Sequence, residues 1–415
     1  MSKDRSHRNA RLRVLAIALA LMALAPAAWA QDAAKPPASD PKPTMTVYGF
    51  AMIDVGQNFT QIDPNWYDTM KVTKLPSYKD QFGKDNSFFA GVRQTRFGVK
   101  ASVPTDLGDL QTKFEIDMFG TGADAGQTTI RLRHAWGELG AFGAGQTDSP
   151  FEDPDLWPNT IEYWGPTGMV FFRNVQVRWT PVKGEKTFML ALERPGASGD
   201  AGVLADRIEL QNIKARFPLP DLTGAFRFGQ KWGYVRVSGA LRKINWDDML
   251  EDQYDLSGGT TGWGLNFSSG LNVGSSSVLR LQYVYGRGIE NYMQDSPVDV
   301  GIGRNGGSTT TPIKGVALPI NGVVAFLDHT WNSKFTSSVG YSGQFIDNSE
   351  GQTPDAFRNG HYAVGNILYT PVPNVMFGGE LQWGRRENFS DGFKSDGVKI
   401  HFAFKYNFSH TLGGQ

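Results

Sequence analysis

The chain has 415 residues, and its 41 basic and 41 acidic side chains give a formal net charge of zero, so bulk charge gives no reason to expect a nucleic-acid partner. After the first thirty residues, no apolar run is long enough for a membrane-spanning helix, which excludes a helical inner-membrane protein. The sequence contains no cysteine, while 49 glycines and 12% aromatic residues are typical of a β-barrel with tight turns and aromatic belts.

The first thirty residues have the three parts of a secretory signal peptide. A basic segment precedes an apolar core from Val14 to Ala25, and Ala28-Trp29-Ala30 is a small-x-small cleavage site. We therefore expect a signal peptide over residues 1–30 and an exported mature chain that begins at Gln31. Residues 31–43 are rich in proline and alanine and predict a periplasmic linker without a core of its own.

Sixteen strand-like segments follow, and short and long connections alternate between them. Their expected spans are 44–58, 87–103, 109–119, 128–140, 143–148, 169–180, 185–194, 221–230, 234–247, 260–272, 278–288, 321–333, 334–346, 359–371, 374–387 and 397–408. The short connections contain turn-forming residues, and the long ones are polar and rich in Gly, Pro, Asp and Asn. Short periplasmic turns and long extracellular loops are typical of bacterial outer-membrane barrels, and an even strand count places both termini in the periplasm.

The last strand shows which face meets lipid. From Val398 to Phe408, one parity is Val, Ile, Phe, Phe, Tyr and Phe, and the other is Lys, His, Ala, Lys and Asn. Because side chains alternate across a strand, the apolar parity faces lipid and the polar parity faces a wet lumen. The pattern predicts a transmembrane antiparallel β-barrel over residues 44–408, a C-terminal tail at 409–415 and a location in the Gram-negative outer membrane. A soluble β-protein is the alternative, which the export signal and long loops disfavour.

Four motifs between residues 47 and 178 carry a family resemblance that covers nearly all of the mature chain. They are Val47-Tyr48-Gly49-Phe50-Ala51-Met52-Ile53-Asp54, Arg93-Gln94-Thr95-Arg96-Phe97-Gly98-Val99-Lys100, Gly143-Ala144-Gly145-Gln146-Thr147 before Phe151-Glu152-Asp153, and Glu162-Tyr163-Trp164-Gly165-Pro166 before the strand that holds Arg173 and Arg178. With these motifs the chain resembles the DcaP-type outer-membrane porins. The resemblance implies a sixteen-stranded barrel, a homotrimer in outer-membrane lipid, and passage of small anionic solutes such as dicarboxylates.

Strand parity predicts a set of basic side chains on the lumen wall. They are Arg96, Lys100, Arg131, Arg133, Arg178, Arg227, Arg236 and Arg242. In the fourth strand, Arg131 and Arg133 oppose the parity of Leu132, His134 and Trp136. Arginine suits carboxylate binding because its planar fork can bond both oxygens and stays charged. For any single arginine, the alternative is a structural ion pair with an inward acid such as Asp54, Glu115, Asp117 or Glu380.

The loop at residues 148–168 follows the fifth strand, as does the loop that folds into the lumen of general porins. Its acidic residues are Asp148, Glu152, Asp153, Asp155 and Glu162. We expect this third loop to fold into the lumen, so that its carboxylates face the arginine wall and set up a transverse field. A solvent-facing acidic loop is the alternative.

Enzyme motifs lack the context that their chemistry needs. Gly301-Ile302-Gly303-Arg304-Asn305-Gly306 matches GxGxxG, but no strand precedes it and no helix follows it. The six histidines have no metal-ligand spacing. We therefore expect no enzymatic activity, no cofactor and no metal site.

These observations favour a passive outer-membrane porin with an arginine-lined constriction that prefers small hydrophilic anions. Two alternatives remain open at this point. One is a general diffusion porin with little charge preference, because the loop acids neutralise the wall. The other is a structural or adhesion barrel that is closed by its long loops.

Overall fold

The computed structural model describes residues 42–414, so the predicted signal peptide and nearly all of the predicted linker lie outside the described residues. The strands are β1 (Thr44–Asn58), β2 (Ser87–Gly91), β3 (Arg96–Thr105), β4 (Gly108–Phe119), β5 (Thr128–Leu139), β6 (Phe142–Asp148), β7 (Arg173–Val182), β8 (Lys186–Glu193), β9 (Ile213–Arg216), β10 (Asp221–Gln230), β11 (Gly233–Asp248), β12 (Gly258–Val273), β13 (Ser277–Arg287), β14 (Val300–Arg304), β15 (Ile313–Ala317), β16 (Pro319–Thr330), β17 (Phe335–Ile346), β18 (Phe357–Tyr369), β19 (Val375–Asn388) and β20 (Lys394–Gly413). Short 3-10 helices lie in the connections: η2 (Pro64–Trp66), η3 (Val72–Lys74), η4 (Gly122–Asp124), η5 (Pro154–Leu156), η6 (Gly202–Leu204), η7 (Ile208–Leu210) and η8 (Glu290–Tyr292). No helix within residues 42–414 is long and apolar enough to cross a membrane.

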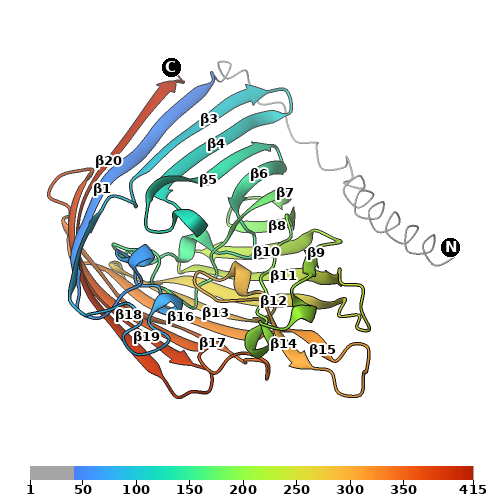
Figure 1. Ribbon diagram of the computed structural model, residues 1–415. Helices are drawn as coiled ribbons and strands as arrows, with labels where there is room; N and C mark the ends of the chain where they lie inside the picture. Colours follow the sequence, from blue (N-terminus) through green and yellow to red (C-terminus); the bar gives the residue numbers. More distant parts are fainter. Residues whose placement is uncertain (1–41, 415) are drawn as a thin grey trace. The chain divides into compact units, whose positions relative to one another are not determined.

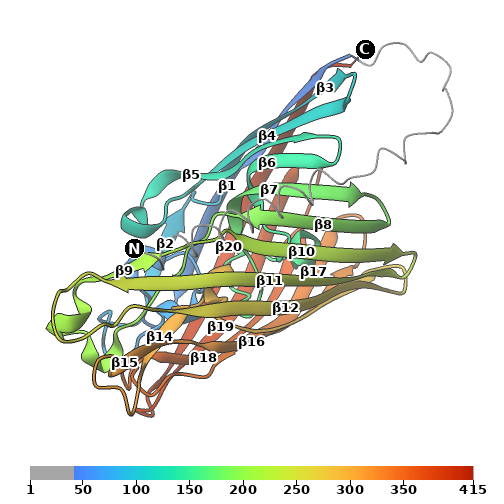
Figure 2. The same ribbon diagram turned by 90° about the vertical axis from the view of Figure 1, so that its right-hand side faces the viewer.

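Sixteen of the described strands form a closed antiparallel ring (Figure 1). The ring runs from β1 through β3–β8, β10–β13 and β16–β20, and it closes because β20 pairs with β1. The other strands extend its edge: β2 pairs with the second half of β1, β9 pairs with the end of β11, and β14 and β15 form a separate two-stranded sheet. Figure 2 shows the long β11 and β12 beside the shorter β6–β8. The predicted sixteen-stranded barrel is confirmed.

The lipid-facing parity of β20 is as predicted. Phe402, Phe404 and Tyr406 are exposed on the outside, whereas Lys399 and His401 are buried inside the barrel. Since a strand alternates its side chains with period two, one apolar and one polar parity are enough to orient the whole strand. The same outward apolar row continues on the neighbouring β19 with Phe377 and Leu381.

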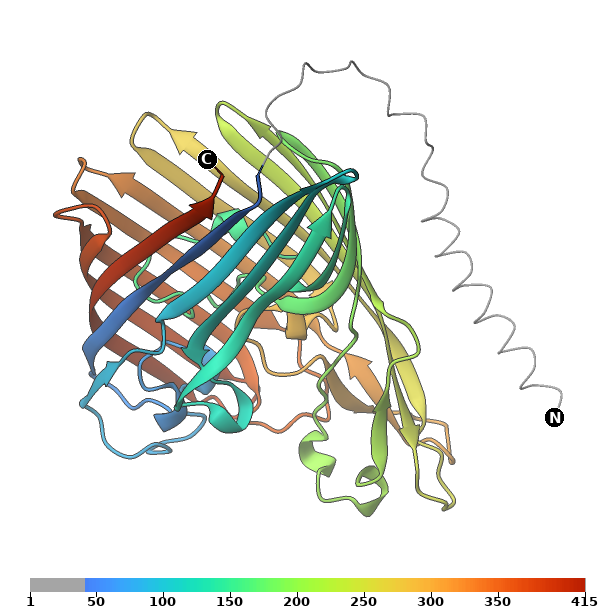
Figure 3. The same cartoon turned by 90° about the horizontal axis from the view of Figure 1, so that it is seen from above.

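The first and last strands of the barrel, β1 and β20, pair with each other (Figure 3). Thr44 at the start of β1 lies opposite Gly413 at the end of β20. Residues 409–413 therefore continue β20, where the sequence had suggested a tail after Phe408. The aromatic alternation stops at Phe408, but β1 extends far enough to satisfy the backbone groups of the following residues.

Short turns join the strands at the end of the barrel where the termini lie. The β18–β19 turn holds Asn374 at φ 69°, and the β3–β4 turn holds Gly108 at φ 104°. Both values are in the left-handed region, which asparagine and glycine tolerate better than other residues. These turns set the antiparallel register and leave the long connections at the opposite end.

One sector of the interior is a packed apolar core, which departs from the expectation of a wholly polar lumen face. Ile320, Val324 and Phe326 of β16 point inward and are buried in one cluster with Tyr362 of β18. From Gly322 to Leu327 the strand is apolar on both parities, because its inner face packs on this core and its outer face meets lipid. Side chains of the long loops fill the barrel against this sector.

Candidate functional site

The 148–168 loop lies inside the barrel, bonded to the inner faces of distant strands. Near its start, the Arg236 guanidinium of β11 donates a hydrogen bond to the Glu152 carbonyl oxygen at 2.6 Å. Near its end, the Ile161 amide donates to the Glu380 carboxylate of β19 at 2.8 Å. These bonds hold the loop across the wall from β11 to β19.

Glu162 anchors the loop from within. Its buried carboxylate accepts hydrogen bonds from the Met70 amide at 3.0 Å and from the Gln382 side chain at 3.2 Å, and it also accepts one from the Trp164 amide. The Lys399 ammonium lies 3.9 Å away. Because these partners surround the carboxylate, Glu162 is a fastening point of the loop and contributes no free charge to the lumen.

A second loop, residues 59–86, also enters the barrel. Its Lys71 ammonium lies 4.5 Å from the ring centres of both Trp66 and Trp164 and 3.3 Å from the Asp295 carboxylate. Cation–π contacts of this kind tie the two inserted loops to each other. The sequence analysis treated residues 59–86 only as a polar extracellular connection and did not predict this insertion.

A charged cavity of about 360 Å³ separates the 148–168 loop from the β3–β7 wall. Its lining residues are Arg96, Lys113, Glu115, Arg133, His134, Asp148, Glu152, Pro154, Trp157, Pro158, Thr160, Tyr163, Phe171 and Arg173. Four of these side chains are basic and three are acidic, so positive charge is in excess. The aromatic rings of the loop form the wall opposite the charged strands.

The arginines of β5 are held by acids of β4. Arg131 bonds both oxygens of Asp117 at 3.0 and 2.5 Å and also reaches the Tyr163 hydroxyl at 2.8 Å. Arg133 bonds Glu115 at 2.6 Å and Asp117 at 3.0 Å. For these two arginines, the structural ion pair that the sequence left open is present, and only Arg133 lines the cavity.

Other basic groups of the cavity form weaker contacts with acidic side chains than Arg133 does. Arg96 and Lys113 lie 3.6 and 3.8 Å from Glu115, beyond hydrogen-bonding distance. Arg173 has no ion pair within the described residues, and its buried Nη1 has no hydrogen-bond partner there. Its guanidinium carbon lies 4.6 Å from the Phe171 ring centre. A buried donor without a partner favours an incoming acceptor, since leaving it unsatisfied is costly.

The sequence analysis missed Lys113, Lys405 and Arg173 as candidate lumen cations. Strand parity already places Lys113 and Lys405 on polar faces, so the alternation of side chains could have identified both as lumen residues. Arg173 is the first residue of β7 and shares the parity of the outward Val175, so alternation alone would place it on the outside. Lys405 and the predicted Lys100 form no ion pair among the described residues and lie on the same inner wall as Arg96.

Arg178 and Arg227 point inward but outside the charged cavity. The Arg178 guanidinium carbon lies 4.5 Å from the Trp136 ring centre, and its Nη2 lies 3.8 Å from Glu138. The Arg227 Nη2 lies 3.3 Å from Asp155. Both arginines are partly exposed.

Arg236 and Arg242 are buried framework residues. Arg236 bonds backbone carbonyls of the 148–168 loop. Arg242 bonds the carboxylates of Asp221 and Asp299 at 2.9 and 2.8 Å, and all three side chains are almost fully buried. The geometry leaves neither arginine free to contact a passing solute.

The loop acids are distributed over several positions. Asp148 and Glu152 line the charged cavity. Asp153 accepts hydrogen bonds from the Tyr234 hydroxyl at 2.9 Å and from the Ser268 hydroxyl, while Asp155 is exposed near Arg227. Thus two of the five acids face the basic groups of the cavity, and the others fasten the loop or lie beside it.

A β-bulge in β5 reverses the parity expected for His134 and Trp136. In the β4–β5 register, Glu115 pairs with His134 and Ile116 pairs with Leu132, which leaves Arg133 as the extra residue. His134 therefore points inward and bonds the Thr147 hydroxyl at 2.9 Å. The prediction that His134 and Trp136 share the outward parity of Leu132 is wrong, because a bulge shifts alternation by one residue.

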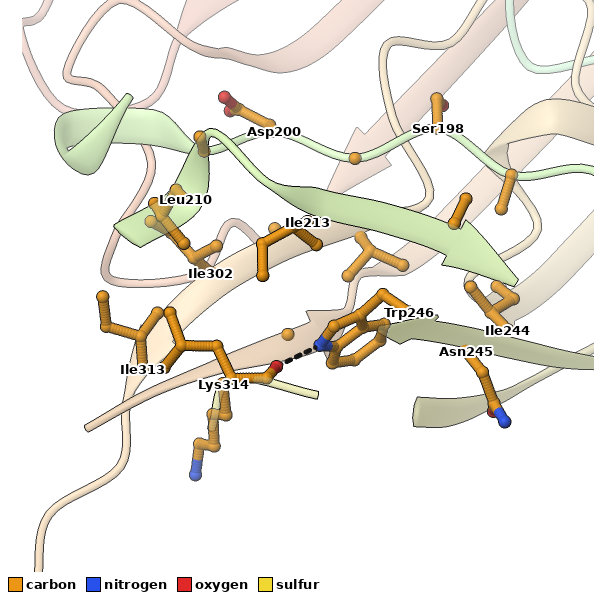
Figure 4. Close-up of a pocket in the computed structure, with 18 of the residues that line it drawn as sticks. Ser198, Asp200, Leu210, Ile213, Ile244, Asn245, Trp246, Ile302, Ile313 and Lys314 are labelled. Atoms are coloured by element: carbon orange, nitrogen blue, oxygen red, sulfur yellow. Dashed lines mark hydrogen bonds between the residues drawn. The ribbon is translucent and has the colours of Figure 1, made fainter. Parts of the chain in front are cut away.

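A second cavity, of about 300 Å³, lies among the long connections and has a different character. It is lined mainly by apolar side chains, including Leu210, Ile213, Ile244, Trp246, Ile302 and Ile313, and the Lys314 side chain points away from it (Figure 4). The Trp246 indole donates to the Leu256 carbonyl oxygen at 2.8 Å. Within residues 42–414, no group of three or more His, Asp or Glu side chains is placed to hold a metal ion.

The family model for the DcaP outer membrane protein matches residues 31–408. Among solved structures, the outer membrane channel DcaP of Acinetobacter baumannii is similar at 21% identity and a TM-score of 0.74, over 91% of this chain and all of that chain. An anion-selective porin from Comamonas acidovorans is similar at 10% identity and a TM-score of 0.56, over 88% of this chain and 100% of that chain. A trimer form of Vibrio cholerae OmpT is similar at 12% identity and a TM-score of 0.52, over 88% of this chain and 100% of that chain. No curated protein matches the chain. These likenesses support the fold.

Proposed function

The chain belongs to the DcaP outer membrane protein family and forms a porin-type channel in the Gram-negative outer membrane, and from this premise we propose that its charged cavity favours small anionic solutes such as dicarboxylates. The proposal includes a homotrimer, as the family resemblance implies and as the OmpT trimer supports by analogy of fold. Transport is passive diffusion through the lumen.

The observation that carries the proposal is Arg173, which forms no ion pair among residues 42–414 and lies in a cavity with an excess of basic groups. A carboxylate that enters the cavity gains a charge-assisted hydrogen bond from the Arg173 Nη1, which has no hydrogen-bond partner in the described part of the chain. Arg96 and Lys113 lie within the same lining and can approach a second carboxylate of the same solute. The three acids of the cavity keep binding weak enough for release, which a channel requires.

Basic groups continue from the cavity along the inner wall. Lys405 and Arg96 both lie near the Phe50 ring, at 4.7 and 5.3 Å, and Lys100 follows on β3 near Tyr48. Neither lysine has an ion pair within the described part of the chain. Such a row of cations supplies successive weak sites for an anion that moves toward the periplasmic end.

Two loops pack against each other in the lumen through apolar side chains. This packing supports one alternative, in which the loops close the barrel. The core cluster joins Met70 and Val72 of one loop with Phe151 and Leu156 of the other. Under this alternative, the purified protein gives no conductance in a bilayer. A non-selective channel is the other outcome, with conductance but no preference for anions.

Current block by succinate tests the proposed function. In the wild-type channel, succinate should interrupt the ion current at concentrations that leave a monocarboxylate without effect. Arg173→Gln should raise the half-blocking concentration roughly tenfold or more, since a hydrogen bond to a charged group contributes about 1.5–3 kcal/mol. Arg385→Gln is the matched control, because Arg385 forms an exposed ion pair with Asp396 on the outer face. Equal block of wild type and Arg173→Gln contradicts the proposal.

A further inference from the structure

Two cations that form no ion pair among residues 42–414 lie on the outer face of the barrel, at the loop end of β11–β13. We propose that Lys243 and Arg287 bind the phosphate of an anionic lipid headgroup in the outer leaflet. The site is separate from the lumen cavity, and it recognises the surrounding membrane and not a transported solute.

The alternation of β11 and β13 places both side chains outside. In β11, Ile244 and Trp246 point into the apolar cavity while Asn245 points away from it, so Lys243 shares the outer parity of Asn245 (Figure 4). In β13, Tyr283 and Tyr285 are exposed on the outside, and Arg287 continues their parity and is exposed.

The strand register brings the two cations to either side of β12. Trp263 of β12 lies opposite Arg287 of β13, and Thr261 of β12 lies opposite Lys243 of β11. Neighbouring strands are about 4.8 Å apart, so the two backbone positions are on the order of 10 Å apart across β12. Both side chains are long and flexible enough to converge on one phosphate group above Thr261 and Trp263.

The position along the strands is that of the lipid headgroups. Below the cations, the Trp263 and Tyr285 rings meet edge to face with centres 5.6 Å apart. Leu265 and Phe267 continue the same outer face toward the periplasm and are exposed. Aromatic belts mark the membrane–water interface of barrels, and the apolar band beneath them faces the acyl chains.

Charge around the rim favours an anionic ligand at this sector. Within residues 42–414, neither Lys243 nor Arg287 forms an ion pair or a side-chain hydrogen bond. On the β19–β20 rim, in contrast, Arg385 pairs with Asp396 at 2.8 Å and Lys394 pairs with Glu387 at 2.8 Å. A phosphate-bearing lipid supplies the missing negative charge on a face that is already in contact with lipid.

Native mass spectrometry of the full mature protein with lipid A in detergent tests the site. Wild type should retain phosphorylated lipid A, and a Lys243→Gln/Arg287→Gln double variant should bind it roughly tenfold more weakly or worse, since each cation near an anionic surface contributes about a factor of five. Lys394→Gln/Arg385→Gln removes the same charge from the paired rim and should bind like wild type.

Four results would overturn the proposal. The first is equal lipid retention by wild type and the Lys243/Arg287 variant. The second is equal retention of dephosphorylated lipid A, which would remove the phosphate from the recognition. The third is displacement of the lipid by inorganic phosphate at equal concentration, which would assign the site to free phosphate. A change of oligomeric state without loss of lipid would likewise overturn it in favour of a subunit interface.

Discussion

Removing Arg242 should destabilise the barrel strongly and leave its ion selectivity unchanged. The guanidinium joins Asp221 of β10 and Asp299 of the long connection after β13, and it also donates to the backbone carbonyl oxygen of Gly288 at 2.7 Å. Arg242→Met keeps much of the side-chain volume but leaves two buried carboxylates without their cation. Breaking a buried pair in this way costs about 3–5 kcal/mol.

Urea unfolding in detergent, followed by tryptophan fluorescence and by gel mobility, measures this cost. Arg385→Met is the control, because the Arg385 and Asp396 side chains are 39% and 40% exposed and such pairs contribute about 0–1 kcal/mol. The Arg242 variant should therefore lose at least about 2 kcal/mol more than the control. If the two variants unfold within about 0.5 kcal/mol of each other, the framework role of Arg242 is refuted. If the Arg242 variant has a changed reversal potential, the prediction that Arg242 does not affect ion selectivity is wrong.

Two further changes probe the loop and the wall. Glu162→Ala removes the carboxylate that holds the Met70 amide, so the inserted loop should become mobile; single-channel recordings should show larger and noisier currents, and unchanged traces would contradict the anchoring role. Gly143→Ala places a methyl group 2.1 Å from the Trp136 ring and should cost about 1–3 kcal/mol of unfolding free energy, whereas Gly137→Ala meets no atom within 4 Å and should be close to neutral in the same urea titration.

Periodicity predicted the wall of the barrel because each strand carries its own orientation. In β20, Phe402, Phe404 and Tyr406 are enough to identify the lipid face, and the lumen face follows. The same reasoning oriented Arg96 and Arg236 correctly. It failed at Arg133, where one extra residue in β5 reversed the facing of His134. A bulge leaves no mark in an alternation pattern when both faces contain polar residues.

The interior was harder to predict because it depends on loops that fold back over long distances in the chain. The contact of Glu162 with Met70 joins residues 92 apart, and that with Gln382 joins residues 220 apart. No local pattern encodes such pairings. The one available signal was the apolar run from Gly322 to Leu327, whose inner parity requires an apolar partner inside the barrel.

Some inward arginines are structural and others are available to a solute, and the difference is whether a carboxylate lies within hydrogen-bonding distance. Arg131, Arg133 and Arg242 meet buried carboxylates at 2.5–3.0 Å, whereas Arg173 meets none within the described residues. Sequence parity identifies which side chains point inward but not which of them share a partner. The free charge of the lumen is therefore a property of the folded chain and not of its composition.

The reversal potential of the single channel under a KCl gradient measures whether the basic cavity makes the channel prefer anions. We predict a potential of the sign that chloride preference gives, and a shift toward zero when Arg173 and Lys113 are both changed to glutamine. Arg385→Gln should leave the potential unchanged. A cation-preferring wild-type channel, or a wild-type potential that the Arg173/Lys113 double variant does not alter, would contradict the claim that this basic cavity selects the permeating ion.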